Sequence, residues 1–201
     1  MHPLADWQPG RIIGVLTDID DTLTTEGAIT ADALQALGRL KAAGLHVVPI
    51  TGRPVGWSEA FAQSWPVDAI VAENGAVALQ YSKGQPLHKR YQQETAVRTA
   101  NFARMQEVLA QIESRIPGAR RSQDSAGRET DIAIDHSEFT HLPQSDIDAV
   151  VRLMQTEGMT ATVSSIHING WYGEHDKLAG ARWIVRELWG RELDAELDRW
   201  V

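Results

Sequence analysis

The chain has 201 residues, of which 43% are hydrophobic and 23% are charged, so it can build a packed core and is not expected to be disordered. Its formal net charge of −8 argues against a nucleic-acid-binding surface, although a local lysine or metal ion can still attract an anionic substrate. Cysteine is absent, which excludes disulfides, thiolate metal sites and cysteine nucleophiles.

The N-terminal residues carry neither the basic start nor the apolar stretch of a signal peptide. No apolar stretch approaches the roughly 20 residues that a membrane-spanning helix needs. We therefore expect a soluble cytoplasmic protein that binds neither membrane nor nucleic acid. The sequence leaves the oligomeric state open.

The first predicted element is a strand at residues 12–16, an apolar run followed by Asp18, Asp20 and Thr22. Such a run is typical of a strand that is buried on both faces of a parallel sheet, where chemistry is carried beyond the carboxyl ends of the strands. Alternation along the strand turns both carboxylates to one side, which is costly unless a cation joins them or one stays protonated. We therefore interpret Asp18 and Asp20 as a functional pair, and the alternative is a pair of ordinary turn residues.

Strands and helices alternate along the next part of the chain. The predicted elements are a helix that Thr30 caps and Gly44 ends, a strand at 46–51, a helix at 57–65 and a strand at 68–72. This order is typical of a doubly wound parallel, Rossmann-like α/β sheet.

The pattern changes after residue 80. Apolar residues at steps of three and four predict helices at 102–116 and 147–154, and alternation predicts strands at 130–135 and 160–168. We expect residues 81–169 to form a small α+β unit. It would be inserted into a core made of residues 1–80 and 170–201.

Two further groups fall at predicted strand ends or helix starts, namely Thr51 with Gly52, and Lys177. With Asp18 and Asp20 they supply a carboxylate nucleophile, an acid for proton transfer, a hydroxyl and a cation, which together suit phosphoryl transfer. The alternatives are an ordinary turn at Thr51 and a solvated lysine at position 177. A lysine is mildly unfavourable at a helix start, which favours a functional role for Lys177.

Three segments resemble motifs of the haloacid dehalogenase (HAD) phosphohydrolase superfamily: residues 18–22 (DIDDT) motif I, 50–53 (ITGR) motif II and 176–177 (DK) motif III. The inserted unit lies between motifs II and III, as in the IIB subclass of sugar-phosphate phosphatases and phosphomannomutase. Segments 71–76 and 131–135 are also similar to that subclass. The resemblance implies a HAD core with an inserted α+β cap domain.

The resemblance also implies roles for the motif residues. Asp18 would attack phosphorus to form an aspartyl-phosphate, and Asp20 would protonate the leaving alkoxide and then activate water. Mg²⁺ would be held by the Asp18 carboxylate and the Asp20 main-chain carbonyl, and Lys177 would stabilise the charge on Asp18 and the phosphate. Phosphate binding falls to the motif II residues Thr51, Gly52, whose N–H is expected at a helix start, and Arg53.

The inserted unit is expected to choose the substrate. His167 and Asn169 share one face of a predicted strand and are candidates for contacting a sugar, although solvated side chains are the alternative. Trp171 is the tryptophan to consider as a ligand platform. A solvated surface is favoured for the polar side chains of Arg120, Arg121, Arg128 and Glu129.

One part of the family pattern is missing, because motif IV supplies a further acidic metal ligand after an apolar strand. Asp194 and Asp198 have a suitable mutual spacing, but they share a helical pattern and follow no such strand. Residues 199–201 look like the start of a strand. We therefore expect a truncated chain that binds Mg²⁺ weakly, turns over poorly and leaves an edge of the first strand unpaired.

The favoured function is a Mg²⁺-dependent phosphatase that acts on a small phosphorylated metabolite, such as a sugar phosphate, through an aspartyl-phosphate on Asp18. One alternative is a phosphomutase or phosphotransferase with the same intermediate. Another is a non-catalytic phosphometabolite-binding module. A phospho-receiver is disfavoured because the strands that end at Thr51 and Ala72 carry no acceptor aspartate.

Overall fold

The apolar run at 12–16 forms strand β1 (Gly14–Thr17), which pairs in parallel with β4 (His46–Pro49) in the computed structural model, where residues 12–25 and 27–201 are described. A parallel bridge between Ile50 and Val71 places β5 (Ile70–Ala72) beside β4. Strands β6 (Val77–Gln80) and β7 (His88–Tyr91) continue the sheet in antiparallel pairing. The parallel part of this sheet contains the strands that the motifs follow.

The free side of β1 is occupied by the last residues of the chain. Trp200 forms a parallel bridge with Gly14, and the N–H of Leu16 donates to the Val201 carbonyl at 2.7 Å. The unpaired edge expected for the first strand is therefore wrong over this stretch, because residues 199–201 pair with it.

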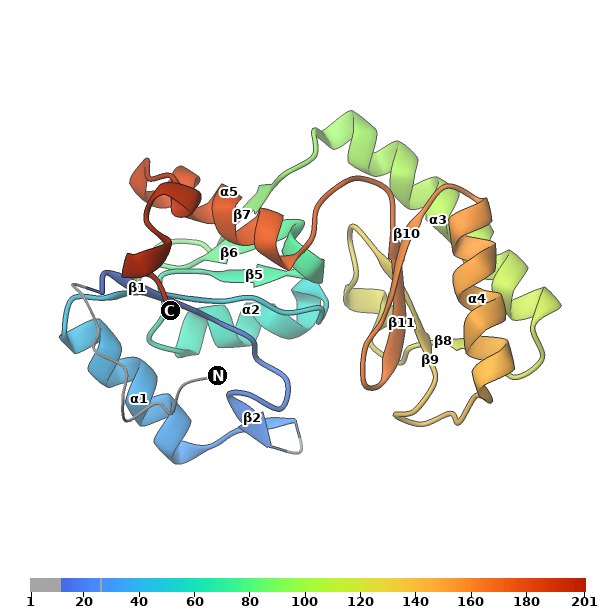
Figure 1. Cartoon of the computed structure of the whole chain (residues 1–201), viewed down its shortest axis with the longest axis horizontal. Coiled ribbons are helices and arrows are strands. Elements are labelled where there is room, and N and C mark those ends of the chain that lie inside the picture. Colours follow the sequence, from blue (N-terminus) through green and yellow to red (C-terminus); the bar gives the residue numbers. More distant parts are fainter. Residues whose placement is uncertain (1–11, 26) are drawn as a thin grey trace.

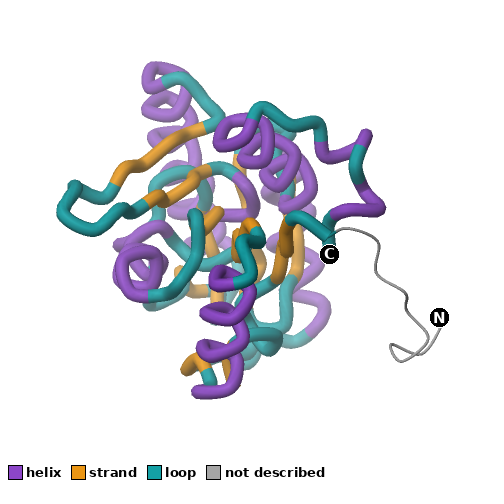
Figure 2. The backbone as a smooth tube through the Cα atoms, turned by 90° about the vertical axis from the view of Figure 1, so that its left-hand side faces the viewer, coloured by secondary structure: helices purple, strands orange, loops and turns teal. Residues whose placement is uncertain are grey.

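Helices cover both faces of the core sheet (Figure 1). Helices α1 (Ala31–Ala42) and α2 (Val55–Ser64) lie on one face, and α5 (Lys177–Trp189) lies on the other. Neighbouring strand residues divide between the two faces. Val47 packs in the cluster with α1 and α2, whereas Val48 packs in the cluster with α5. A view from the core side shows the helices outside the strands (Figure 2).

A tight turn at Glu73–Gly75 connects β5 to β6 and packs against the first turn of α5. Its residues have positive φ angles of 48°, 56° and 107°, and Gly75 occupies the last of these because side chains rarely adopt that conformation. A Cβ on Gly75 would lie 2.2 Å from the carbonyl oxygen of Asp176, and one on Gly180 would lie 2.5 Å from the Cα of Gly75. The turn and α5 therefore meet backbone to backbone.

The second lobe, which we call the cap, is an antiparallel sheet in the order β10-β11-β9-β8. Helices α3 (Thr95–Arg115) and α4 (Gln144–Thr156) pack on it around a core that includes Met105, Leu109 and Met154. The strands are β8 (Arg120–Arg121), β9 (Ile132–Asp135), β10 (Thr160–Val163) and β11 (His167–Trp171). A short hairpin, β2 (Thr24–Thr25) with β3 (Ala28–Ile29), follows the first strand in the core.

Two sequence-based expectations change in this region. The single strand expected at 160–168 is a hairpin, because the Ser164 hydroxyl accepts from the N–H of His167 and makes a turn between β10 and β11. Strand β7 belongs to the core sheet, and Gly170 and Trp171 belong to the cap sheet. The chain therefore exchanges lobes after Tyr91 and after Trp171, not after residues 80 and 169.

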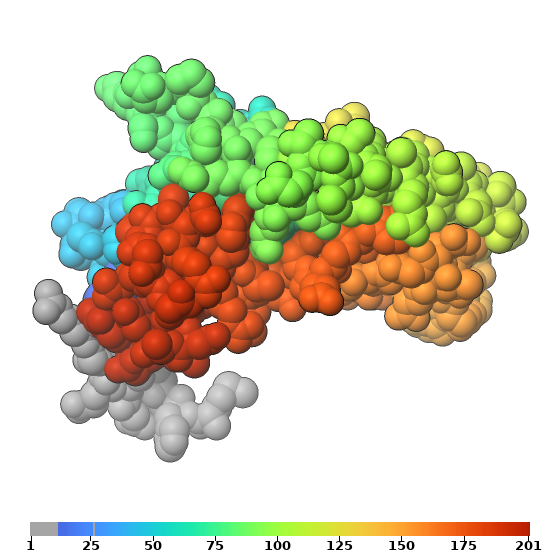
Figure 3. All heavy atoms as spheres, turned by 90° about the horizontal axis from the view of Figure 1, so that it is seen from above, coloured from blue at the N-terminus to red at the C-terminus, as the bar shows by residue number. Residues whose placement is uncertain are grey.

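The two connections between the lobes run next to each other (Figure 3). The Gln93 side-chain amide donates to the Tyr172 carbonyl at 2.6 Å, which joins the outgoing and returning segments. In residues 12–25 and 27–201, every helix is too short or too polar to cross a lipid bilayer.

Candidate active site

The site begins directly after β1, where Asp18 meets Lys177. The Lys177 ammonium donates to Asp18 Oδ1 at 2.9 Å, and the two side chains are 46% and 40% exposed. Lys177 is the first residue of α5, and the Asp176 side chain caps that helix by accepting from the N–H of Ala179 at 2.7 Å. The fold therefore brings together two residues that are far apart in the sequence, and both stay accessible to a ligand.

Asp20 lies beside the loop that follows β4. Thr51 Oγ1 donates to Asp20 Oδ2 at 3.1 Å, and Arg53 Nε donates to Asp20 Oδ1 at 2.9 Å. Burial alone would lower the pKa of Arg53, but the hydrogen bond and the charge of Asp20 raise it. Each Asp20 oxygen accepts one hydrogen bond and keeps a second lone pair, so the carboxylate can still contact a ligand.

The expected position of Gly52 at a helix start is wrong. Helix α2 begins at Val55, and the N–H of Val55 donates to Glu73 Oε1 at 3.0 Å. A buried carboxylate thus occupies the N-terminus of α2. Gly52 lies in the loop before it, where a Cβ would be 3.0 Å from Asn74 Oδ1.

The cavity over these residues has a volume of about 770 Å³, is open to solvent and is lined by residues of both lobes. Its core side includes Asp18, Asp20, Asp21, Gly52, Arg53, Asn74 and Lys177, and its cap side includes Glu138, residues 162–167, Asn169 and Trp171. This volume is within the usual range for small-molecule sites. The core acids and the two candidate cap residues therefore face one space.

His167 and Asn169 lie on the cap side of the cavity, and both side chains have partners there. His167 Nε2 is 2.9 Å from Glu138 Oε2, and burial lowers the pKa of His167 despite the nearby acids. The Asn169 amide donates to Asp131 at 3.2 Å, so its carbonyl oxygen is the group left for a ligand. Trp171 also lines the cavity, but it is 1% exposed and its indole N–H donates to the His175 carbonyl.

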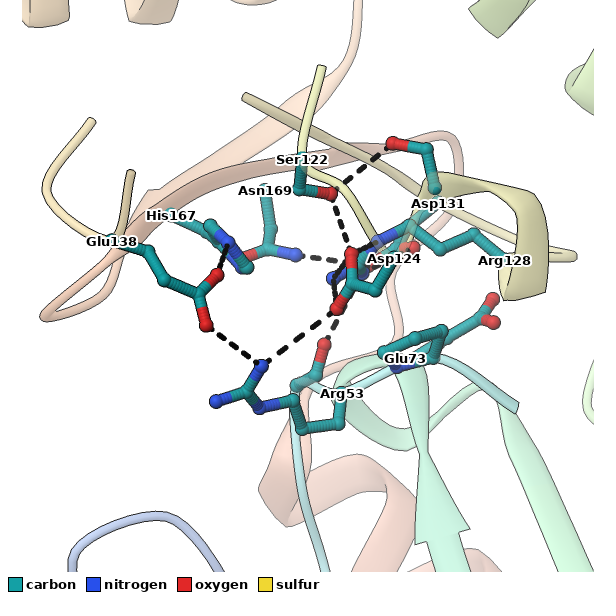
Figure 4. A network of polar contacts seen from close by, with 12 residues as sticks. Arg53, Glu73, Ser122, Asp124, Arg128, Asp131, Glu138, His167 and Asn169 are labelled. Carbon is teal, nitrogen blue, oxygen red and sulfur yellow. Dashed lines mark hydrogen bonds and ion pairs between the residues drawn. The ribbon is translucent and has the colours of Figure 1, made fainter. Parts of the chain in front are cut away.

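Arg53 connects the core acids to the cap (Figure 4). One of its terminal nitrogens, Nη1, lies 3.6 Å from Glu138 Oε1 and 3.8 Å from Asp124 Oδ2. Sequence reasoning missed Glu138 and Asp124, since each is a single acid in a polar loop without a motif around it. The expected phosphate ligand Arg53 is thus shared by a core acid and two cap acids.

Behind Arg53 lies a buried group of charges that the sequence did not reveal. The Arg128 side chain is 2% exposed, so the expected solvated position is wrong. Its Nη1 donates to both oxygens of Asp131, at 2.8 and 2.9 Å, and to the Gly52 carbonyl at 3.2 Å. Burial disfavours the charged guanidinium, but the charges of Asp131 and Asp124 outweigh it and raise the pKa of Arg128.

Glu73 forms the second part of this junction. It is fully buried and accepts hydrogen bonds from the N–H groups of Val55, Glu129 and Thr130 and from the Thr130 hydroxyl. Burial first, and then the charge of Asp131, raises the pKa of Glu73 to about 7. One core carboxyl thus binds the start of α2 and the cap segment that carries Arg128.

The donors that could hold a metal ion are few. Among the described residues, no cluster of three or more acidic or histidine side chains is arranged around a metal position. Within the same part of the chain, Lys177 contacts Oδ1 of Asp18, which leaves Oδ2, and the Asp20 carboxylate is engaged by Thr51 and Arg53. Mg²⁺ commonly takes one or two protein oxygens together with substrate phosphate and water, so the Asp18 carboxylate and the Asp20 main-chain carbonyl fit such an ion.

Four features together define a hydrolase of the HAD class. They are the parallel sheet, the acids after its first strand, the threonine after its second strand and the lysine after the insertion. The chain belongs to the haloacid dehalogenase-like hydrolases, whose sequence profile matches residues 15–115. The expected superfamily, fold class and hydrolase activity are therefore confirmed. No curated protein matches the chain.

Solved structures share this fold at low sequence identity. Protein 0175 of Thermoplasma acidophilum is 18% identical, with a TM-score of 0.70 over 92% of this chain and 75% of that one. A trehalose-6-phosphate phosphatase related protein is 17% identical, with a TM-score of 0.60 over 87% and 74%. The sucrose-phosphatase of Synechocystis, solved with sucrose and phosphate, is 13% identical, with a TM-score of 0.61 over 89% and 71%.

Proposed function

We propose that the protein hydrolyses the phosphate monoester of a small sugar-like metabolite through an aspartyl-phosphate on Asp18. The observation that carries this proposal is the 2.9 Å contact between Lys177 and Asp18 in a cavity that residues of both lobes line. A carboxylate nucleophile repels a phosphate dianion, and an ammonium group at this position offsets that repulsion. The names of two structural neighbours, one related to a trehalose-6-phosphate phosphatase and the other a sucrose-phosphatase, support a sugar phosphate.

The chemistry divides between the two aspartates. An oxygen of Asp18 forms a bond to phosphorus as the ester P–O bond breaks, and Asp20 gives its proton to the leaving oxygen. Asp20 then takes a proton from water, which attacks phosphorus and releases inorganic phosphate from Asp18. Thr51 and Arg53 each donate to one oxygen of Asp20 and orient its carboxyl group for these transfers.

The remaining residues bind and orient the substrate. Mg²⁺ on the Asp18 carboxylate and the Asp20 carbonyl would neutralise part of the phosphate charge. The phosphate lies between Lys177 and the Thr51–Gly52 loop. The sugar moiety extends toward His167 and the free carbonyl oxygen of Asn169 on the cap.

The test is the release of inorganic phosphate from a panel of phosphorylated sugars and p-nitrophenyl phosphate in the presence of Mg²⁺. We expect Asp18→Asn to lose at least about a thousandfold in kcat/KM, which is roughly 4 kcal/mol of transition-state stabilisation. Asp148→Asn, an exposed acid of α4, is the matched control and should keep full activity. Turnover retained by Asp18→Asn would exclude the covalent mechanism, and transfer of phosphate back to sugar without its release would indicate a phosphomutase.

A further inference from the structure

The cap side of the cavity carries little positive charge. Its side chains are mainly hydroxyl-bearing or apolar, and they come from the β10–β11 hairpin at residues 162–167, with Asn169, Trp171 and Glu138. Among the described residues of the cap that line the cavity, Glu138 is the acidic one, and none is a lysine or arginine. Burial lowers the pKa of His167, so its imidazole does not offset that negative charge at neutral pH.

Lys177 and Arg53, the lysine and arginine among the described residues that line the cavity, already pair with acidic side chains. Lys177 pairs with Asp18, at the position where the phosphate reacts. Arg53 contacts Asp20, Glu138 and Asp124 at 2.9, 3.6 and 3.8 Å. A second anionic group on a substrate would therefore compete with three carboxylates for Arg53, and among the described residues that line the cavity no other lysine or arginine lies on the side of Glu138.

We propose that the cap side of the cavity selects a neutral, hydroxyl-bearing leaving group and rejects phosphate esters with a second anionic group, and that Glu138 imposes this selectivity. The proposal rests on the proposed phosphatase function and specifies its substrate class. Hydroxyls can bond to the Glu138 carboxylate, the His167 ring and the Asn169 carbonyl oxygen. A carboxylate or second phosphate at the same place meets like charge in a partly desolvated cavity, which is costly.

The effect of a second anionic group can be tested with two pairs of compounds. Glucitol 6-phosphate and 6-phosphogluconate differ in a terminal hydroxymethyl group against a carboxylate, and so do glycerol 3-phosphate and 3-phosphoglycerate. We expect kcat/KM to be at least tenfold higher for the alcohol member of each pair. Calorimetric titration of Asp18→Asn with the same four compounds should show the same order in Kd, so the preference can be measured without turnover.

Glu138→Gln keeps the shape and a hydrogen-bonding side chain but removes the charge. In this variant the preference for the alcohol member should shrink about tenfold, through faster turnover and tighter binding of the acid. Because Glu138 also contacts the hydroxyls of the alcohol member, the readout is the ratio of kcat/KM and of Kd within each pair. Glu107→Gln, at an exposed position on α3, is the matched control and should keep the wild-type preference.

The outcomes separate this inference from the function on which it rests. Absence of phosphate release from p-nitrophenyl phosphate and from all four compounds would overturn the phosphatase proposal, while the binding order would still decide the selectivity. Equal kcat/KM and Kd within each pair would overturn the selectivity. So would a preference that Glu138→Gln leaves unchanged.

Discussion

An acidic and a basic side chain pair both at the end of β1 and at the junction between the lobes, but the two ion pairs differ in their exposure to solvent. At the end of β1, Asp18 and Lys177 form an ion pair whose side chains are 40% and 46% exposed. At the junction, Arg128 and Asp131 form a pair whose side chains are 2% and 0% exposed. The first pair is accessible to a ligand, whereas the second is enclosed by protein and holds the cap next to the loop at Gly52.

The two ion pairs also differ in how much their loss would change the free energy of unfolding. Exposed ion pairs contribute roughly 0–1 kcal/mol to stability, so Lys177 can be available for catalysis at little cost to the fold. Removing one partner of a buried pair leaves an uncompensated charge and costs several kcal/mol. Substitutions at the two places should therefore act on different properties of the enzyme.

The largest effect on stability is expected from Arg128→Ala. This change leaves Asp131 buried without its cation and should lower the free energy of unfolding by about 3–5 kcal/mol in urea denaturation. Arg186→Ala is the matched control, since its pair with Glu192 is exposed, and it should cost less than about 1 kcal/mol. Equal losses in the two variants would remove the distinction between the two regions.

A smaller change in the free energy of unfolding is expected from Glu73, whose titration makes stability depend on pH. Its pKa is raised from 4.5 to about 7, so the unfolded chain releases this proton first and stability falls as pH rises between these values. The contribution is complete below about pH 4.5 and lost above about pH 7, and it amounts to about 3 kcal/mol at most. In Glu73→Gln the difference in unfolding free energy between pH 5 and pH 8 should shrink by up to this amount. An unchanged difference would show that Glu73 does not titrate in this range.

Lys177→Ala tests the exposed side of the comparison. We expect kcat/KM to fall by about a hundredfold, or roughly 2.7 kcal/mol, because the ammonium beside Asp18 is lost. The unfolding free energy should change by less than about 1 kcal/mol. Arg182→Ala, at an exposed ion pair on the same helix, should leave both quantities close to those of the wild type. A stability loss in Lys177→Ala as large as that of Arg128→Ala would contradict the separation of roles.

Local patterns in the sequence were enough to predict the parallel part of the sheet and its helices. The apolar run before Asp18 indicated β1, and Thr30 and Gly44 marked the limits of α1, where the Thr30 hydroxyl accepts from the N–H of Ala33. Motif residues could be found for the same reason, because Asp18 and Thr51 each directly follow a strand end. These features depend on residues that are close together in the chain.

The junction could not be predicted because its partners come from distant loops. Arg128 looked solvated in a polar stretch, and only the arrangement of the lobes brings it to Asp131 and the Gly52 carbonyl. Glu73 lies in segment 71–76, whose similarity to the IIB subclass did not distinguish a buried acid from a turn residue. Glu138 belongs to the cavity only because β9 and β11 place its loop opposite Arg53. Tertiary position, more than residue type, decides what each of these charges does.

Gly75 and Gly180 contact each other through main-chain atoms, and this contact has a consequence for catalysis. Since a single methyl group at either residue would overlap main-chain atoms of its neighbour, helix α5 would have to shift away from the sheet to admit it. Lys177 starts that helix, and its ammonium would be carried away from Asp18. The absence of side chains at Gly75 and Gly180 thus sets the spacing between Lys177 and Asp18, on which the proposed charge compensation at phosphorus depends.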